Sequence, residues 1–196
     1  MSGRQSRSGS QPGGGVRRIL TGIFCIARGR AEGFDHFSPT IQGFLGSLAP
    51  LLAFPAVGSV LMLAGGGGSA ALADLLGTIC AVLAPAVLSH WLASLWGREA
   101  AWLRFITAFN WCQWVIPVVA MLVLASVSIA IRIGMPANGA AIVAMAILGG
   151  YGMWLHFFLA RRGLDISPGR AWVLVFVVNL GTVLLVIVPR LLTAGE

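Results

Sequence analysis

The sequence predicts an all-α protein, a polytopic transmembrane helical bundle of about five spans with its N-terminus inside the cell and its C-terminus outside. Three observations predict it. Apolar residues make up 58% of the 196 residues and charged residues 10%, whereas a soluble domain carries about 25% charged residues. Five apolar stretches each reach the ~20 residues that a helix needs to cross about 30 Å of hydrocarbon. All 13 basic residues are arginine, and most of them fall in alternate gaps between these stretches.

The N-terminal residues divide into a tail and an amphipathic segment. Residues 1–15 are mainly Gly, Ser, Arg and Gln, which cannot bury apolar area, so we predict a disordered cytoplasmic tail. In residues 16–40 the apolar side chains begin with helical spacing and the arginines lie off the apolar face, which is typical of an interfacial helix on the inner membrane surface. The apolar run 19–27 is short for a cleaved signal peptide and is followed by Arg28, so we expect no cleavage there.

Five continuous apolar stretches make up the predicted transmembrane domain, residues 41–196. Because barrel strands would alternate polar and apolar residues over ~10 positions, continuous stretches favour helices. Pro50 and Pro55 leave two alternatives open for the first span, one kinked helix or a re-entrant pair, and the glycines at 65–68 predict a flexible outer loop. The expected spans are about 41–64, 71–96, 105–133, 137–160 and 171–192.

The arginines predict the orientation of the spans. With the N-terminus inside, the inner segments 1–40, 97–104 and 161–170 hold eleven arginines and the outer segments hold only Arg132 and Arg190. This is a strong positive-inside bias. The aromatic belt agrees with it, since three tryptophans lie at the inner boundary: Trp96, Trp102 and Trp172. We therefore predict a multi-pass protein of a bacterial inner (cytoplasmic) membrane.

Small residues predict how the spans pack. In the second span they recur every four residues from Ala73 to Gly97, so another helix can approach along that face. Asn179, near the middle of the fifth span, is expected to form a hydrogen bond to a neighbouring helix. From these patterns we expect a compact bundle whose helix-packing residues include Gly77, Ala81, Ser89 and Asn179.

Two histidines and several aromatic and amide side chains define a candidate inner-facing vestibule. His90 and His156 fall at comparable depth in the inner half of their spans. One hypothesis makes them axial ligands of a haem; the alternative makes them interfacial residues that form hydrogen bonds to amide side chains or lipid headgroups. The candidate vestibule residues are His90, Trp91, Asn110, Gln113, Trp114, Trp154 and His156.

No other group of residues in the sequence indicates a catalytic or metal-binding site. The sequence has no paired intramembrane carboxylates, no metal-ligand spacing and no cysteine pattern typical of a disulfide or zinc site. We expect no catalytic residues, no metal and no cofactor.

The chain resembles the Ypt-interacting-protein superfamily of Rab-associated five-span membrane proteins, which has bacterial members. The resemblance rests on five spans over residues 16–196, a Phe-x-x-Phe-Ser-Pro approach from Phe34 to Pro39, and a Pro-rich first span. It implies a five-span fold with a cytoplasmic N-terminal segment. The Asp-Leu-Tyr-Gly-Pro type signature of eukaryotic members is absent, so no functional residue is transferred from them.

Three classes of function remain. The favoured one is a non-enzymatic integral membrane protein that organises, assembles or accompanies a membrane complex. The alternatives are a small transporter or channel acting as a homo-oligomer, and a haem-binding redox protein. The expected partners are the lipid bilayer and other membrane proteins or further copies of the chain. No nucleic-acid binding is expected, because the arginines form no continuous basic surface.

Overall fold

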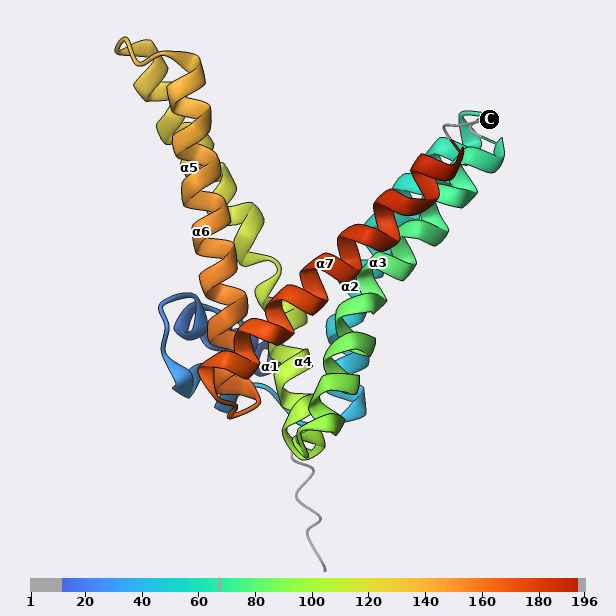
Figure 1. Cartoon of the computed structure of the whole chain (residues 1–196), viewed down its shortest axis with the longest axis vertical. Helices are drawn as coiled ribbons and strands as arrows, with labels where there is room; N and C mark the ends of the chain where they lie inside the picture. The colour runs from blue at the N-terminus through green and yellow to red at the C-terminus, as the bar shows by residue number, and fades with distance from the viewer. Residues whose placement is uncertain (1–11, 67, 194–196) are drawn as a thin grey trace, which may run out of the picture.

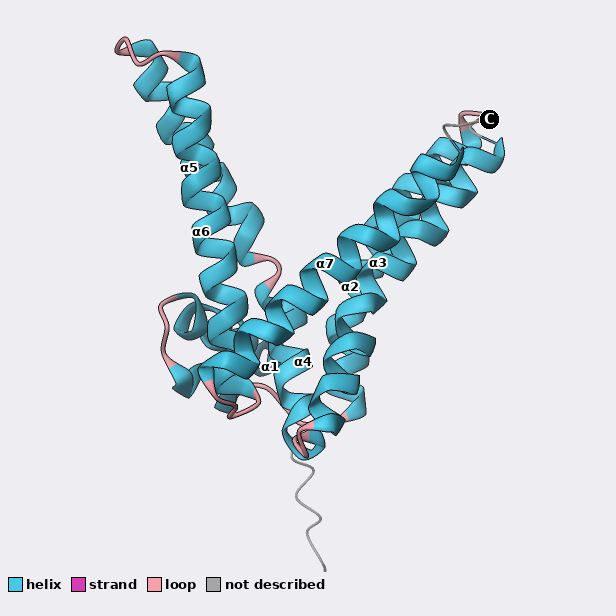
Figure 2. Cartoon of the chain, viewed as in Figure 1, coloured by secondary structure: helices cyan, strands magenta, loops and turns pink. Residues whose placement is uncertain are grey.

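The computed structural model describes residues 12–66 and 68–193, and within this part of the chain every regular element is a helix (Figure 2). The predicted all-α class is confirmed. The elements in chain order are α1 (Pro12–Ala27), the 3-10 helix η1 (Ala31–His36), α2 (Ile41–Ala64), α3 (Gly68–Leu95), α4 (Glu99–Cys112), α5 (Val115–Arg132), α6 (Ala137–Gly163) and α7 (Pro168–Thr193).

Five helical segments are long and apolar enough to cross a membrane, as the sequence predicts. They are Ile41–Ala64, Leu72–Leu95, Glu99–Arg132, Ala137–Gly163 and Pro168–Ile187. The third comprises two helices, α4 and α5, separated by Gln113 and Trp114. The five segments support a multi-pass membrane protein.

The helices form a V rather than the expected compact bundle (Figure 1). One arm is the α5–α6 pair, and the other contains α2, α3 and α7. The arms meet at the base, where α4 packs against α1, α2, α3 and α6, and where α6 meets α7. The third span is interrupted at the base, and α5 continues from there beside α6 and away from α2 and α3.

The hydrophobic core lies in the base of the V. The stretch from Phe105 to Asn110 in α4 is buried at every position, which is unusual for a helix with lipid on one side. Leu155 and Leu159 of α6, Val175 of α7 and Ile26 of α1 contribute the largest fully buried neighbours. Helix α4 is therefore the central element around which the other helices pack.

The first span is one continuous helix that contains both Pro50 and Pro55, so the structure shows no re-entrant pair. Thr40 caps its N-terminus by accepting a 3.1 Å hydrogen bond from the Gly43 N–H. The predicted outer loop at 65–68 includes Gly67, which lies outside the described residues, and α3 begins directly after it at Gly68.

The amphipathic segment is a helix that docks partly onto the protein. Residues 1–11 of the predicted tail lie outside the described residues, and α1 begins at Pro12, before the expected start at Val16. Gly22 and Gly33 allow α1 and η1 to approach closely: a Cβ on Gly22 would lie 2.8 Å from the Phe37 ring, and one on Gly33 would lie 2.6 Å from Ile26 Cγ1. The two phenylalanines of the Phe-x-x-Phe-Ser-Pro approach are buried here and anchor η1 to the base.

Candidate functional site

The third span breaks where α4 ends and α5 begins. Pro117 has no N–H, and in a continuous helix its ring would collide with the Gln113 carbonyl. The chain crosses this point with bonds of the tighter three-residue type, from the Trp114 N–H to the Trp111 carbonyl at 3.3 Å and from the Ile116 N–H to the Gln113 carbonyl at 3.3 Å. This break places the side chains of Asn110 and Gln113 beside the meeting point of the two arms.

A cavity of about 350 Å³ lies next to this break. Its wall combines apolar side chains with five polar ones and contains no charged residue. Five helices contribute to it, from both arms and the base. Its lining residues are Leu51, Ala81, Val82, Pro85, Phe109, Asn110, Gln113, His156, Val178, Asn179, Thr182 and Val183.

Asn110 links α4 to α2 at the edge of this cavity. Its amide donates a 3.0 Å hydrogen bond to the Ser47 hydroxyl, and that hydroxyl donates at 2.6 Å to the Phe44 carbonyl. Asn110 is 3% exposed and Ser47 is fully buried. In an apolar setting an unpaired amide would be expensive, so this pair holds the two helices in a defined register.

Gln113 and His156 form a second polar pair, between the end of α4 and α6. The Gln113 Nε2 and His156 Nε2 atoms lie 3.5 Å apart. The amide nitrogen can only donate, so a hydrogen bond between these two atoms requires the imidazole tautomer in which Nε2 carries no proton. The His156 ring also contacts the Phe109 ring, with centroids 5.1 Å apart.

Helix α7 presents oxygen atoms to the cavity. The Asn179 amide donates at 2.7 Å to the Val175 carbonyl, and the Thr182 hydroxyl donates at 2.8 Å to the Val178 carbonyl. One of the two Asn179 amide hydrogens and the Thr182 hydroxyl hydrogen are thus used within α7, while the Asn179 amide oxygen accepts no hydrogen bond from the described part of the chain. The cavity can accept hydrogen bonds from a small neutral polar ligand or from water.

The structure brings together three of the seven candidate vestibule residues: Asn110, Gln113 and His156 all line the cavity. The other four lie elsewhere. His90 and Trp91 are exposed on α3, and Trp154 stacks on Phe158 along α6 with ring centroids 5.7 Å apart.

Trp114 lies on the side of the break that faces α1 and contacts the Phe54 ring, with centroids 5.2 Å apart. Its buried indole N–H has no hydrogen-bond partner among the described residues.

The two histidines do not share a site. The His90 ring packs edge-on against Trp102 with centroids 4.7 Å apart, whereas His156 packs against Phe109. These two aromatic residues are seven positions apart on α4, which is about 10 Å along a helix axis. No group of three potential metal ligands occurs in the described ranges. The two imidazole rings therefore pack against different turns of α4.

The predicted packing residues have different environments. Ser89 is buried and accepts a 3.1 Å hydrogen bond from the Trp102 indole, and Ala81 lines the cavity. A Cβ on Gly77 would have no atom within 4 Å, because this part of α3 belongs to the splayed arm. The expected cross-helix hydrogen bond of Asn179 is wrong, since the amide donates to its own helix.

Sequence reasoning missed the break and part of the polar surroundings. Pro117 lies inside the apolar run predicted as one continuous span, although a proline inside a helical pattern ends or kinks the helix. Ser47 and Thr182 were not singled out. Comparing how deep each polar residue lies in the membrane, across all five spans, would have grouped Ser47 and Thr182 with Asn110 and Asn179.

Comparison of the sequence with known protein families, with curated proteins and with solved structures found no match.

Proposed function

We propose that this chain is a non-enzymatic membrane protein that organises, assembles or accompanies a larger membrane complex. The observation that carries the proposal is the splayed shape. Within the most apolar window of each span, only 6% to 22% of the residues are buried inside the chain. Helix α5 packs extensively against α6 alone among the described helices. Because the two arms meet only at the base, the outer surfaces of both arms stay available to helices of other subunits.

Open glycines on the arms support this proposal. At Gly58 of α2, Gly77 of α3, and Gly149 and Gly150 of α6, a Cβ would have no atom within 4 Å. Small residues allow membrane helices to approach closely, and packing contacts drive helix association where the solvent is lipid. These surfaces suit a partner helix, either from another membrane protein or from a further copy.

The arginines support an orientation in which the base of the V faces the cytoplasm. The turns between α3 and α4 and between α6 and α7 both lie at the base. Arg98 lies in the first of these turns, and Arg161 and Arg162 lie in the last helical turn of α6. In contrast, Arg132 ends α5 at the far tip of its arm. With the positive side inside, we place the base and α1 on the cytoplasmic side of a bacterial inner membrane.

A test compares the assembly state of the full chain in native-lipid nanodiscs with that of two variants. Gly150→Leu adds bulk to an open surface, which the isolated chain tolerates but a closely packed partner helix does not. Met145→Leu, at another exposed position of α6, is the matched control. We expect the wild type and the control to be recovered with a stoichiometric partner or second copy, and Gly150→Leu to be recovered alone. A wild-type chain that is monomeric and without a stoichiometric partner would contradict the proposal.

A second candidate, a small transporter, is favoured by one observation. Transporters bind substrates at interrupted helices near the middle of the membrane, and the cavity beside Gln113 lies at such an interruption. Flux of a small neutral solute into proteoliposomes, abolished by Asn179→Leu but not by Met145→Leu, would rank this function first.

A further inference from the structure

Two apolar grooves lie along the side of α1 that faces the protein. The first lies between α1 and the start of α5, and the second lies between α1 and the middle of α2. The first has a volume of about 670 Å³ and the second about 330 Å³, both within the ~300–1,000 Å³ range of ligand sites. Leu20, Ile23 and Trp114 line both grooves. The two grooves therefore run on either side of one ridge made by Leu20 and Ile23.

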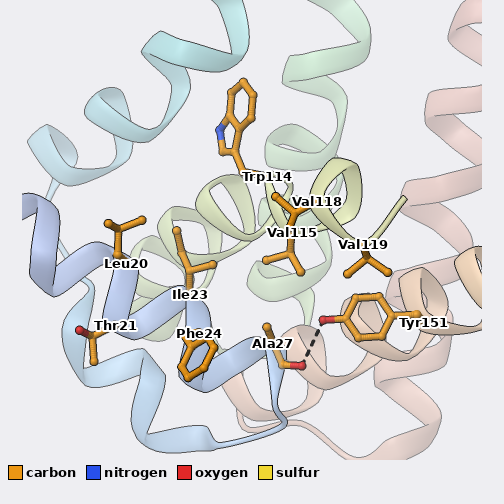
Figure 3. A pocket seen from close by; sticks show the side chains of 10 residues that line it. All are labelled: Leu20, Thr21, Ile23, Phe24, Ala27, Trp114, Val115, Val118, Val119 and Tyr151. Carbon is orange, nitrogen blue, oxygen red and sulfur yellow. Dashed lines mark hydrogen bonds between the residues drawn. The ribbon is translucent and has the colours of Figure 1, made fainter. Parts of the chain in front are cut away.

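The walls of these grooves suit hydrocarbon. Figure 3 shows the first groove between α1 and α5, lined by Leu20, Phe24, Val118 and their neighbours. Its two hydroxyl groups are already used: Tyr151 donates at 3.1 Å to the Ala27 carbonyl and Thr21 donates at 2.9 Å to the Arg17 carbonyl. The second groove is lined by apolar side chains and two tryptophans.

A guanidinium group stands beside the first groove. The Arg28 Cζ atom lies 3.9 Å from the centroid of the Phe24 ring, and Phe24 is itself a wall of that groove. Arg17, Arg18 and Arg30 are further cations of the same segment, against two nearby carboxylates, Glu32 and Asp35.

None of these four arginines forms an ion pair within the described part of the chain, and Arg18 donates a 3.0 Å hydrogen bond to the Asp35 carbonyl. The segment thus carries unneutralised positive charge next to two channels for hydrocarbon.

We propose that the two grooves hold the two acyl chains of one anionic phospholipid, with its phosphate at Arg28. Two adjoining apolar grooves that share Leu20, Ile23 and Trp114 match the two chains of a diacyl lipid, and the cation beside one of them matches the headgroup. This proposal is independent of the proposed function, because it concerns the grooves beside α1 and not the open glycine surfaces of the arms.

The test measures lipid retention by native mass spectrometry after the full chain is extracted from vesicles containing equal amounts of phosphatidylglycerol and phosphatidylcholine. The wild type is expected to retain one phosphatidylglycerol in preference to phosphatidylcholine. Arg28→Gln is expected to reduce that preference about fivefold, the effect of one arginine near an anionic headgroup. Arg132→Gln, at the far tip of α5, is the control and should keep the wild-type preference.

A second variant tests the grooves separately from the charge. Val118 lines only the first groove and is 57% exposed, so Val118→Trp fills that groove without entering the core. It should reduce retention of both lipids, whereas Val87→Trp on exposed α3 should not.

Equal retention of the two lipids by the wild type would overturn the proposal. So would a lipid-free dimer that Val118→Trp dissociates, because a second copy would then occupy the grooves.

Discussion

The amide of Asn110 in α4 donates a 3.0 Å hydrogen bond to the hydroxyl of Ser47 in α2, and both side chains are buried. This contact joins residues 63 positions apart in the part of the molecule where the two arms meet. It joins two buried polar side chains that belong to different helices.

Ser47→Ala is expected to destabilise the fold because it leaves the Asn110 amide without its acceptor. Interhelical hydrogen bonds in membrane proteins contribute about 0.6 kcal/mol on average and up to about 1.7 kcal/mol, so a double-mutant cycle with Asn110→Leu should give a coupling energy in that range. Reversible unfolding in mixed micelles measures it. Ser126→Ala is the control, since that exposed hydroxyl donates only to its own helix; an equal effect at both sites would contradict the role of the pair.

The interruption of the third span depends on Pro117. In Pro117→Ala the N–H of residue 117 can donate to the Gln113 carbonyl, so α4 and α5 can merge into one helix and redirect the α5–α6 arm. Spin labels at Leu76 of α3 and Ile142 of α6, both exposed, report the distance between the arms by pulsed electron resonance. We expect the distance distribution to shift in Pro117→Ala.

Pro55→Ala is the matched control for this measurement, because Pro55 already lies inside the continuous helix α2. Its distance distribution should equal that of the wild type. If Pro117→Ala also leaves the distribution unchanged, the divergence of the arms has a different cause.

The sequence was sufficient to predict the spans that consist of one uninterrupted helix. The first span was expected at 41–64, and α2 runs from Ile41 to Ala64, because continuous apolarity and chain length depend on local composition alone. The same local information could not reveal the V. The run that contains Pro117 is equally apolar in a continuous helix and in a broken one. The two structures differ at the Gln113 carbonyl, which receives no hydrogen bond from residue 117 because proline has no N–H.

The candidate site was predictable only in part for the same reason. Asn110, Gln113 and His156 were grouped by depth along their spans, and depth follows from counting residues. Which side of a helix a residue faces depends on its neighbours in space. His90 has a depth comparable to that of His156, but its ring packs against Trp102, in another part of α4. The Asn179 amide donates to a carbonyl in the preceding turn of α7 and not to another helix.

Gly33 is the tightest point between η1 and α1. Gly33→Ala is expected to destabilise the base by about 1–3 kcal/mol, the usual effect of overpacking, because its Cβ would lie 2.6 Å from Ile26 Cγ1 and 2.8 Å from the Gly22 carbonyl oxygen. The matched control is Gly150→Ala, where a Cβ has open space and alanine favours the helix by about 1 kcal/mol. Thermal unfolding in detergent should show the two substitutions moving the midpoint in opposite directions, and a loss of stability at Gly150 instead would show that its surface is already occupied.

The orientation can be tested at two exposed positions at opposite ends of the V, Ser38 near the base and Asn138 at the tip of the α5–α6 arm. In a background where Cys25, Cys80 and Cys112 are replaced by alanine, Ser38→Cys and Asn138→Cys each supply one thiol. A membrane-impermeant maleimide applied to spheroplasts should label only Asn138→Cys, because the orientation that we propose places the arginine-rich base in the cytoplasm. Both variants should be labelled equally after detergent is added, which shows that each thiol is reactive. Labelling of Ser38→Cys alone in intact spheroplasts would place the base, and with it α1 and its grooves, on the outer face of the membrane.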